Sequence, residues 1–347
     1  MIQITAFLYS VLAIFVFGVL IFIHEGGHFL AARLCKITVK EFSIGMGPKL
    51  FSRTSKKSGT AYSLRALPIG GYVSMAGEDE ESEDPNGFCN KSIFKRFVVI
   101  IAGAFMNLLL GFIIMTVIVF SQNNLASTKI AKFNDGAVSS EKLMVDDIIV
   151  KVGSTRVHTG DELVYEIMNQ GDKPVDIVVK RNGEKIELND VVFANTTEMG
   201  VVFGDCDFLV YAEESGFVNY VKHAFFRSVS AVKMVYDSIF NLITGKYGMD
   251  TISGPIGVTE AVGTAAKSGA LNLLVFVAYI SINLGVFNLL PFPALDGGRG
   301  VFLLIEGVRG KPIDRRIEAY VNFVGIVLLF TLMIVVSFKD VVKLIFR

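Results

Sequence analysis

The sequence predicts a multi-pass α-helical membrane protein with four transmembrane helices, a β-rich region beside the membrane and one separate α/β domain. The chain of 347 residues is 52% hydrophobic and has a mean hydropathy of +0.54, which is too apolar for an ordinary soluble protein. Four apolar runs cover residues 4–32, 97–120, 270–290 and 320–338. Each is close to the ~20 apolar residues that a helix needs to cross the hydrocarbon core of a bilayer.

The distribution of positive charge predicts how these spans are oriented. Eleven Lys and Arg residues lie between the first and second runs, and five lie between the third and fourth. The positive-inside rule places both segments in the cytoplasm, so the N-terminus and residues 121–269 lie outside. Lys plus Arg and Asp plus Glu number 33 each. The balanced charge gives no reason to expect a nucleic-acid partner.

These patterns divide the chain into seven expected segments. They are the first span (1–34), a cytoplasmic-side β-rich loop region (35–92), the second span (93–121), an extracytoplasmic domain (122–208), an amphipathic juxtamembrane helix region (209–268), the third span (269–299), and a cytoplasmic loop with the fourth span (300–347).

The motif His24-Glu25-Gly26-Gly27-His28 at the end of the first span predicts a metal site. Residues four apart on a helix share one face and lie about 6 Å apart along the axis, so both imidazoles can meet one ion. Glu25 is placed to handle the protons of a metal-bound water, and zinc is the usual metal. A hydrogen-bonded polar patch is the alternative. Charged residues in a span cost roughly 2.5–3.5 kcal/mol each, which favours a functional site.

The third span ends in a segment that can bring a third ligand to the same depth. Pro291 and Pro293 break the helix, which is tolerable there only if protein covers the backbone or it lines a polar cavity. Asp296 follows and can bind zinc. Alternatively, it is a turn residue before Gly-Gly. Asn288 directly precedes this segment.

The second span contains Gly103 and Asn107 at helical spacing. Such a pair usually packs helices together. Asn107 alternatively faces the metal cavity.

The first cytoplasmic loop alternates apolar and polar residues in 38–44 and again in 62–75, around Gly70-Gly71. This alternation predicts a small sheet or hairpin at the inner face of the membrane. An edge strand there would pair with an extended substrate, or the hairpin would be a structural plug. The acidic run 78–84 is expected to be a solvated, mobile loop.

The long external segment predicts a domain and a helix. Short strands at 147–152, 175–180 and 185–188, a turn at 181–184 and a helical stretch at 160–169 indicate a small α/β domain. An apolar stripe from Phe217 to Phe240 predicts an amphipathic helix on the outer membrane surface or on this domain. His158 and His223 are expected at the surface.

The motifs together resemble the site-2 protease family, in particular its bacterial PDZ-containing branch typified by the regulator-of-sigma-E protease. The matching segments are 24–28, Gly47-Pro48-Lys49-Leu50, Pro68-Ile69-Gly70-Gly71-Tyr72-Val73, Gly254-Pro255-Ile256-Gly257 and Asn288 through Gly298. The resemblance implies that His24, His28 and Asp296 bind Zn2+ and that Glu25 activates water. It also implies a single PDZ domain at 124–206 and a membrane-associated hairpin near the substrate. Substrate contacts are expected from Asn107, Asn288, Pro291, Pro293, Gly70 and Gly71.

The expected function is that of a zinc-dependent endoprotease of the cytoplasmic membrane that cleaves transmembrane segments, such as those of anti-sigma factors or remnant signal peptides. Its partners would be these substrates, the lipid bilayer and a peptide or C-terminus at the PDZ-like domain. One alternative is a catalytically inactive scaffold bearing a PDZ domain. A metal transporter would distribute ionisable residues over several spans, which this sequence does not.

Two positions depart from the family pattern. Ala104 stands where the second-span motif often has Pro, and Asp146 stands where the domain usually has Gly.

Overall fold

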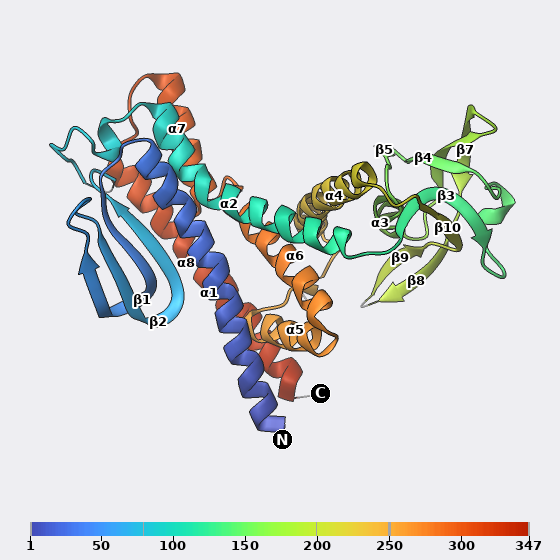
Figure 1. The fold of residues 1–347 in the computed structure, drawn as a ribbon, viewed down its shortest axis with the longest axis horizontal. Coiled ribbons are helices and arrows are strands. Elements are labelled where there is room, and N and C mark those ends of the chain that lie inside the picture. The colour runs from blue at the N-terminus through green and yellow to red at the C-terminus, as the bar shows by residue number, and fades with distance from the viewer. Residues whose placement is uncertain (1, 79, 199, 249–250, 346–347) are drawn as a thin grey trace. The chain divides into compact units, whose positions relative to one another are not determined.

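The computed structural model describes residues 2–78, 80–198, 200–248 and 251–345 of the chain (Figure 1). It contains two compact units, Met1–Gly111 with Ser253–Arg347, and Phe112–Ile252. In the described residues four helices are long and apolar enough to cross a membrane, with spans Phe7–Leu34, Ile93–Phe120, Ala270–Leu289 and Arg315–Lys343. The four expected spans are therefore confirmed as helices, and the fourth is longer than the run 320–338 that predicted it.

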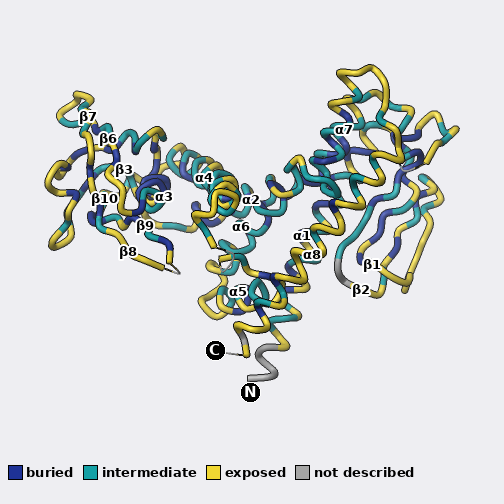
Figure 2. The backbone as a smooth tube through the Cα atoms, turned by 180° about the vertical axis from the view of Figure 1, so that it is seen from behind, coloured by how far each residue is buried: buried dark blue, intermediate teal, exposed yellow. Residues whose placement is uncertain are grey.

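Glycines bring the helices of the first unit close together. A methyl group on Gly27 of α1 (Ile2–Leu34) would overlap the carbonyl oxygen of Ala102 in α2 (Ile93–Phe120). A methyl group on Gly285 of α6 (Ala270–Leu289) would lie 2.9 Å from the Ala104 carbonyl oxygen. Small residues permit such close packing inside membranes, where water cannot drive helices together. By contrast, α8 (Arg315–Ile345) is exposed along most of its length (Figure 2).

A short helix that the sequence pattern does not separate, α5 (Pro255–Lys267), is tied to both ends of the chain. The carboxylate oxygen Oδ2 of buried Asp340 in α8 accepts hydrogen bonds from the backbone N–H groups of Gly254 and Gly257, each at 2.9 Å. These are the N-cap and N3 positions, whose N–H groups have no partner inside the helix. Gly263 lies against the ring of Tyr9 in α1. The region expected as one amphipathic segment thus holds two helices.

The loop between the first two spans forms two long strands, β1 (Val39–Thr54) and β2 (Ala61–Met75), that fold over on themselves. Ser43 pairs with both Tyr72 and Ser63, so the first part of β1 lies between the two parts of β2. Gly45 and Gly47 adopt φ of +82°, which lets β1 change direction. The segment Gly71–Met75 of β2 is then an edge of this sheet, because its ladder partners all lie on β1.

A partly buried charge network around Glu41 joins the folded-over parts of the two strands. Burial raises the pKa of Glu41, but hydrogen bonds from Ser63, Lys49, Tyr72 and Arg65 outweigh it and lower the pKa to about 2. The ionised carboxylate accepts from Arg65 at 3.1 Å. The same guanidinium donates to the Ser43 hydroxyl at 3.0 Å. The two parts of the sheet are therefore joined by side chains as well as by their ladder.

Residue Glu78 departs from the expectation that the acidic run is solvated. Its side chain is 13% exposed and pairs with Arg299 at 2.5 Å. Glu80 of the same run is 77% exposed, as expected, while Asp79 lies outside the described residues. The expectation was wrong for Glu78 because its partner is more than 200 residues away in the sequence and its charge pattern gives no hint of it.

The second unit is built on an antiparallel sheet in the order β10-β3-β4-β6-β7. Its strands are β3 (Leu125–Phe133), β4 (Ile148–Val152), β6 (Val175–Arg181), β7 (Glu184–Val191) and β10 (Phe208–Glu213), with β5 (Thr155–Arg156) beside β4, and a separate pair of β8 (Ala194–Glu198) and β9 (Val201–Asp205). Leu163 and Ile167 of α3 (Gly160–Gln170) join the apolar core of the sheet. The expected strands, the helix and the turn at Asn182-Gly183, which has positive φ at both residues, are present.

The amphipathic stripe forms the single helix α4 (Phe217–Ile243), which packs on the domain in the same unit. Tyr165 of α3 donates to Asp237 at 2.7 Å. His158 stacks on Phe226 with ring centroids 4.0 Å apart. His223 is 3% exposed and lies 3.3 Å from Glu213, so the expectation of a surface position was wrong for this residue. A sequence pattern shows which face of α4 is apolar, but not that its polar face is covered.

Asp146 adopts φ of +71°, the left-handed conformation that the family's glycine takes without strain. Its carboxylate pairs with Lys129 at 2.6 Å.

The cap of α5 leads to a stability prediction. Asp340→Ala removes the acceptor for two backbone N–H groups and should cost about 1 kcal/mol, as other N-cap losses do. We expect the thermal unfolding midpoint in detergent to fall by a few degrees. Asp340→Asn, which keeps one oxygen acceptor, serves as the control and should recover most of the loss. An unchanged midpoint in Asp340→Ala would show that α5 does not depend on this cap.

Candidate metal centre

The two histidines of the first span face one point. His24 and His28 lie one turn apart on α1, and their Nε2 atoms are 3.2 Å apart. The side chains are only 10% and 12% exposed. Two ring nitrogens at this distance are stable only if one carries a proton or if a cation lies beside both.

The contacts of the Nδ1 atoms of His24 and His28 determine whether each Nε2 atom has a lone pair free to bind a metal. Nδ1 of His28 donates to the backbone carbonyl of Val99 in α2 at 2.8 Å, which leaves its Nε2 with a lone pair. Nδ1 of His24 lies 3.3 Å from the amide nitrogen of Asn107. The Oδ1 atom of Asn107 has no hydrogen-bond partner among the described residues. Exchanging the amide oxygen and nitrogen of Asn107 lets it accept from His24, which frees the second Nε2 as well.

A carboxylate completes the cluster from a distant part of the chain. Asp296, the first residue of α7 (Asp296–Arg309), places Oδ2 at 3.1 Å from Nε2 of His24 and at 3.3 Å from Nε2 of His28. The Oδ2 atom of Asp296 is buried and has no hydrogen-bond partner among the described residues, which is the environment of an oxygen that binds a cation.

The residues present fit a zinc ion. Two ligands at 2.0–2.1 Å from one tetrahedral ion lie about 3.3 Å from each other. The three separations in this cluster are 3.1, 3.2 and 3.3 Å. Two imidazoles with one carboxylate are an established donor set for catalytic zinc, with the fourth position left open. His24, His28 and Asp296 are thus the residues that could hold the metal.

Gly103 of α2 forms one wall of this cluster. A methyl group there would overlap Nε2 of His28 and lie 2.8 Å from Nε2 of His24. Only a residue without a side chain leaves the space in which these ring nitrogens converge. The sequence pattern assigned Gly103 to helix packing and not to the metal centre, although its position one helical turn before Asn107 was the signal available for it.

Glu25 lies on the side of the cluster that faces the hairpin. It is half-buried on α1. A methyl group on Gly71 of β2 would be 3.0 Å from its Cγ atom. The sheet edge Gly71–Met75 therefore begins beside Glu25. Of the residues expected to contact substrate, the structure brings Gly71 to Glu25 and Asn107 to His24. Gly70, with φ of +81°, lies against Met46 within the sheet.

The broken segment before Asp296 wraps tightly around the start of α7. Methyl groups on Gly297 and Gly298 would overlap the carbonyl oxygens of Leu290 and Phe292. Pro293 contacts Gly325 of α8. The Pro residues shape the chain at this point, and Asn288 lies in the last turn of α6.

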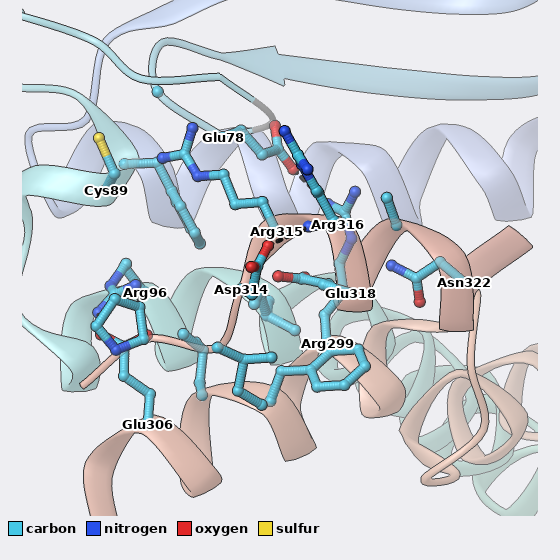
Figure 3. Close-up of a pocket in the computed structure, with 18 of the residues that line it drawn as sticks. Glu78, Cys89, Arg96, Arg299, Glu306, Asp314, Arg315, Arg316, Glu318 and Asn322 are labelled. Atoms are coloured by element: carbon cyan, nitrogen blue, oxygen red, sulfur yellow. Dashed lines mark hydrogen bonds and ion pairs between the residues drawn. The ribbon is translucent and has the colours of Figure 1, made fainter. Parts of the chain in front are cut away.

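Ion pairs hold α7 in place around a cavity of about 850 Å³ (Figure 3). The guanidinium of Arg96 in α2 binds both carboxylate oxygens of Glu306, and Arg299 pairs with Glu78. The cavity is lined by the loop after β2, by α2, by α7 and by the start of α8, and the metal cluster is not part of its lining.

The position of Gly103 leads to a prediction about metal binding. Gly103→Ala should displace both imidazoles and lower the affinity for zinc about 10–100-fold, the range seen when ligands lose their orientation. Metal analysis of the purified protein after dialysis against a zinc buffer measures this. Gly18→Ala on α1, where a methyl group meets open space, is the matched control and should bind zinc normally. Full zinc binding by Gly103→Ala would contradict the proposed position of the ion.

Known proteins are similar to this chain over most of its length. The profile of peptidase family M50 matches residues 12–332. A candidate zinc metalloprotease of Clostridium acetobutylicum is 37% identical over 338 residues, which cover 97% of this chain and 98% of the relative. The regulator of sigma-W protease RasP of Bacillus subtilis is 30% identical over 415 residues, which cover 95% of this chain and 97% of that protein. A family match over most of the chain favours an enzyme over a scaffold, so the chain belongs to peptidase family M50, the site-2 proteases, and is a zinc-dependent protease of the cell membrane.

Proposed function

We propose that His24, His28 and Asp296 hold the zinc ion and that Glu25 is the general base and acid of peptide hydrolysis. The convergence of two Nε2 atoms and one Oδ2 atom at 3.1–3.3 Å, from helices at opposite ends of the chain, is the observation that carries this proposal. Asn107 and the Val99 carbonyl orient the imidazoles.

When bound, zinc acts as a Lewis acid toward the scissile carbonyl and lowers the pKa of water toward ~7. Glu25, next to the imidazoles on α1, accepts the proton of the attacking water. It then delivers this proton to the leaving amine. Its half-buried position beside the sheet edge puts its carboxylate within reach of a peptide lying along Gly71.

The edge segment Gly71–Met75 is the proposed binding strand for the substrate. A transmembrane helix hides its amides in internal hydrogen bonds, so it must unwind before attack. Pairing with an edge strand compensates for the exposed backbone groups. Asn107, Asn288, Pro291, Pro293 and Gly70 are proposed to shape the space around this unwound segment.

We propose that the N-terminus and the second unit are extracytoplasmic and that the metal centre lies toward the cytoplasmic leaflet. The two basic loops support this orientation.

The antiparallel sheet and the single helix α3 at 124–206 support a PDZ-like domain, which would bind a peptide C-terminus or limit access of large substrates. Phe120, the last residue of α2, stacks on Tyr220 of α4 at 4.9 Å. This contact supports a position of α4 at the membrane surface, with its exposed apolar side chains toward lipid. Within this proposal the seven segments keep the locations expected from the sequence.

The proposed substrates are single transmembrane segments of membrane proteins. The name of the Bacillus relative, regulator of sigma-W protease, points to anti-sigma factors. Remnant signal peptides are substrates of the same kind, because each is a single apolar helix that has been separated from its external domain.

The roles of Glu25 and Asp296 are separable by experiment. Glu25→Gln should bind zinc normally but cleave a transmembrane reporter about 10²–10⁴-fold more slowly, because only proton transfer is lost. Asp296→Ala should lose zinc, with a drop in affinity greater than the roughly 10–100-fold that follows loss of an outer-shell partner. Zinc content and reporter cleavage are measured on the same samples. Wild-type turnover in Glu25→Gln, or wild-type zinc affinity in Asp296→Ala, would exclude the corresponding role.

The orientation is tested with single cysteines in a cysteine-free chain. Lys57 and Lys185 are both exposed, the first between β1 and β2 and the second on β7. A membrane-impermeant maleimide on intact cells should label Lys185→Cys and leave Lys57→Cys unlabelled until the cells are opened. The reverse pattern would invert the proposed topology.

A further inference from the structure

The carboxylate of Glu78 binds a backbone N–H group on the outer edge of β2, the edge that begins beside Glu25. Its Oε2 atom accepts the backbone N–H of Met75 at 3.2 Å. Its Oε1 atom pairs with Arg299 at 2.5 Å. This residue therefore connects the last residue of β2 with α7, the helix that begins at Asp296 (Figure 3).

The N–H of Met75 points away from β1. The neighbouring N–H, that of Ala76, donates to the carbonyl oxygen of Thr38 on the β1 side at 2.9 Å. Successive residues of an extended strand direct their backbone groups to opposite sides. Met75 therefore faces the outer edge, and by the same alternation Val73 and Gly71 face it too.

An added strand would pair with this outer edge through Gly71, Val73 and Met75. At Met75 the acceptor that such a strand would supply is already present, because the Glu78 carboxylate binds that N–H. Arg299 holds this carboxylate in place, three residues along α7 from Asp296. The end of the available edge is thereby fixed relative to the metal cluster.

We propose that Glu78 is a positioning residue that ends the substrate-pairing edge of β2 and so sets which peptide bond lies at the metal. The proposal rests on strand addition at Gly71–Met75. With Glu78 in place, a substrate strand pairs with Gly71 and Val73 only. Without it, the strand can also pair with Met75 and shift along the edge.

The shift has a defined size. A one-residue shift would turn every substrate side chain to the other face of the strand, so the allowed shift is two residues. The consequence is a second cleavage position, two residues from the first, in a protein whose metal centre is unchanged.

Product masses test this directly. Wild-type protein, Glu78→Ala, Glu78→Gln and Glu80→Ala are incubated with one transmembrane reporter, and the products are identified by mass spectrometry. We expect Glu78→Ala to give an additional pair of products displaced by two residues. Glu78→Gln keeps an oxygen that can accept from Met75 and should cut at the wild-type bond. Glu80, which is exposed, is the matched control and should also leave the cleavage position unchanged.

A second measurement needs neither substrate nor zinc. Glu78→Ala should accelerate hydrogen exchange at the Met75 amide about fivefold, as expected for loss of one hydrogen bond, while Glu80→Ala should not.

The outcomes separate this proposal from the protease assignment. Cleavage by Glu78→Ala at the wild-type bond alone would overturn the edge-ending role and leave the catalytic assignment intact. Loss of cleavage without a displaced product would show that Glu78 is merely structural and would overturn it equally. Displaced products in Glu78→Gln would contradict the acceptor role. If the wild-type protein cleaved no reporter, the proposed function itself would fail.

Discussion

The close approach of α1 and α2 is the contact on which the site depends. Gly27 of α1 lies against the Ala102 carbonyl of α2, and Gly103 of α2 leaves the space that the two imidazoles fill. This approach also brings the Val99 carbonyl within 2.8 Å of His28. Larger side chains at either glycine would separate the helices, and the rings would lose both their space and their orienting partner. The packing of two spans and the chemistry of the site thus have one cause.

Asp296, the third proposed ligand, depends on a second set of contacts. It is the first residue of α7, and the irregular segment before it separates α7 from α6. Such a segment has no regular series of backbone hydrogen bonds to hold it in place. Ion pairs from Arg96 to Glu306 and from Arg299 to Glu78 hold α7 from two sides. The pair of Arg96 with Glu306 is largely buried, and removing one partner of such a pair is costly because the other charge is left without compensation. Polar contacts of α7 therefore support the metal centre together with the packing of the spans.

Much of the fold and the centre of the site follow from the sequence because their signals are strong there. The length and apolarity of the four runs predict the spans. The positions of His24, His28 and Asp296 relative to those runs predict that the three residues lie at one depth of the membrane, and the structure brings their side chains together. His24 and His28 are four residues apart, and this helical spacing is visible in the sequence itself. The resemblance to site-2 proteases adds the same assignment.

Other features have no signal of this kind. The Val99 carbonyl is a backbone group, so its residue type says nothing about its role. Glu78 stands in an acidic run that reads as a solvated loop, and only the fold reveals its partner. The double pairing of β1 depends on two glycine bends, and alternation alone does not show which strand segments meet. His223 is covered because α4 packs on the domain, and a stripe of apolar residues cannot report what lies against the opposite face.

The alanine two residues before Asp296 connects the metal centre to the fourth span. Ala294 adopts φ of +73°, which costs an L-residue about 1 kcal/mol. Its N–H donates to Oδ1 of Asn322 on α8 at 3.2 Å. A helix that supplies no ligand therefore helps to fix the direction from which the carboxylate enters. Pro293 of the same segment also lies against Gly325 of α8, so this largely exposed span borders the approach to Asp296 at two neighbouring positions.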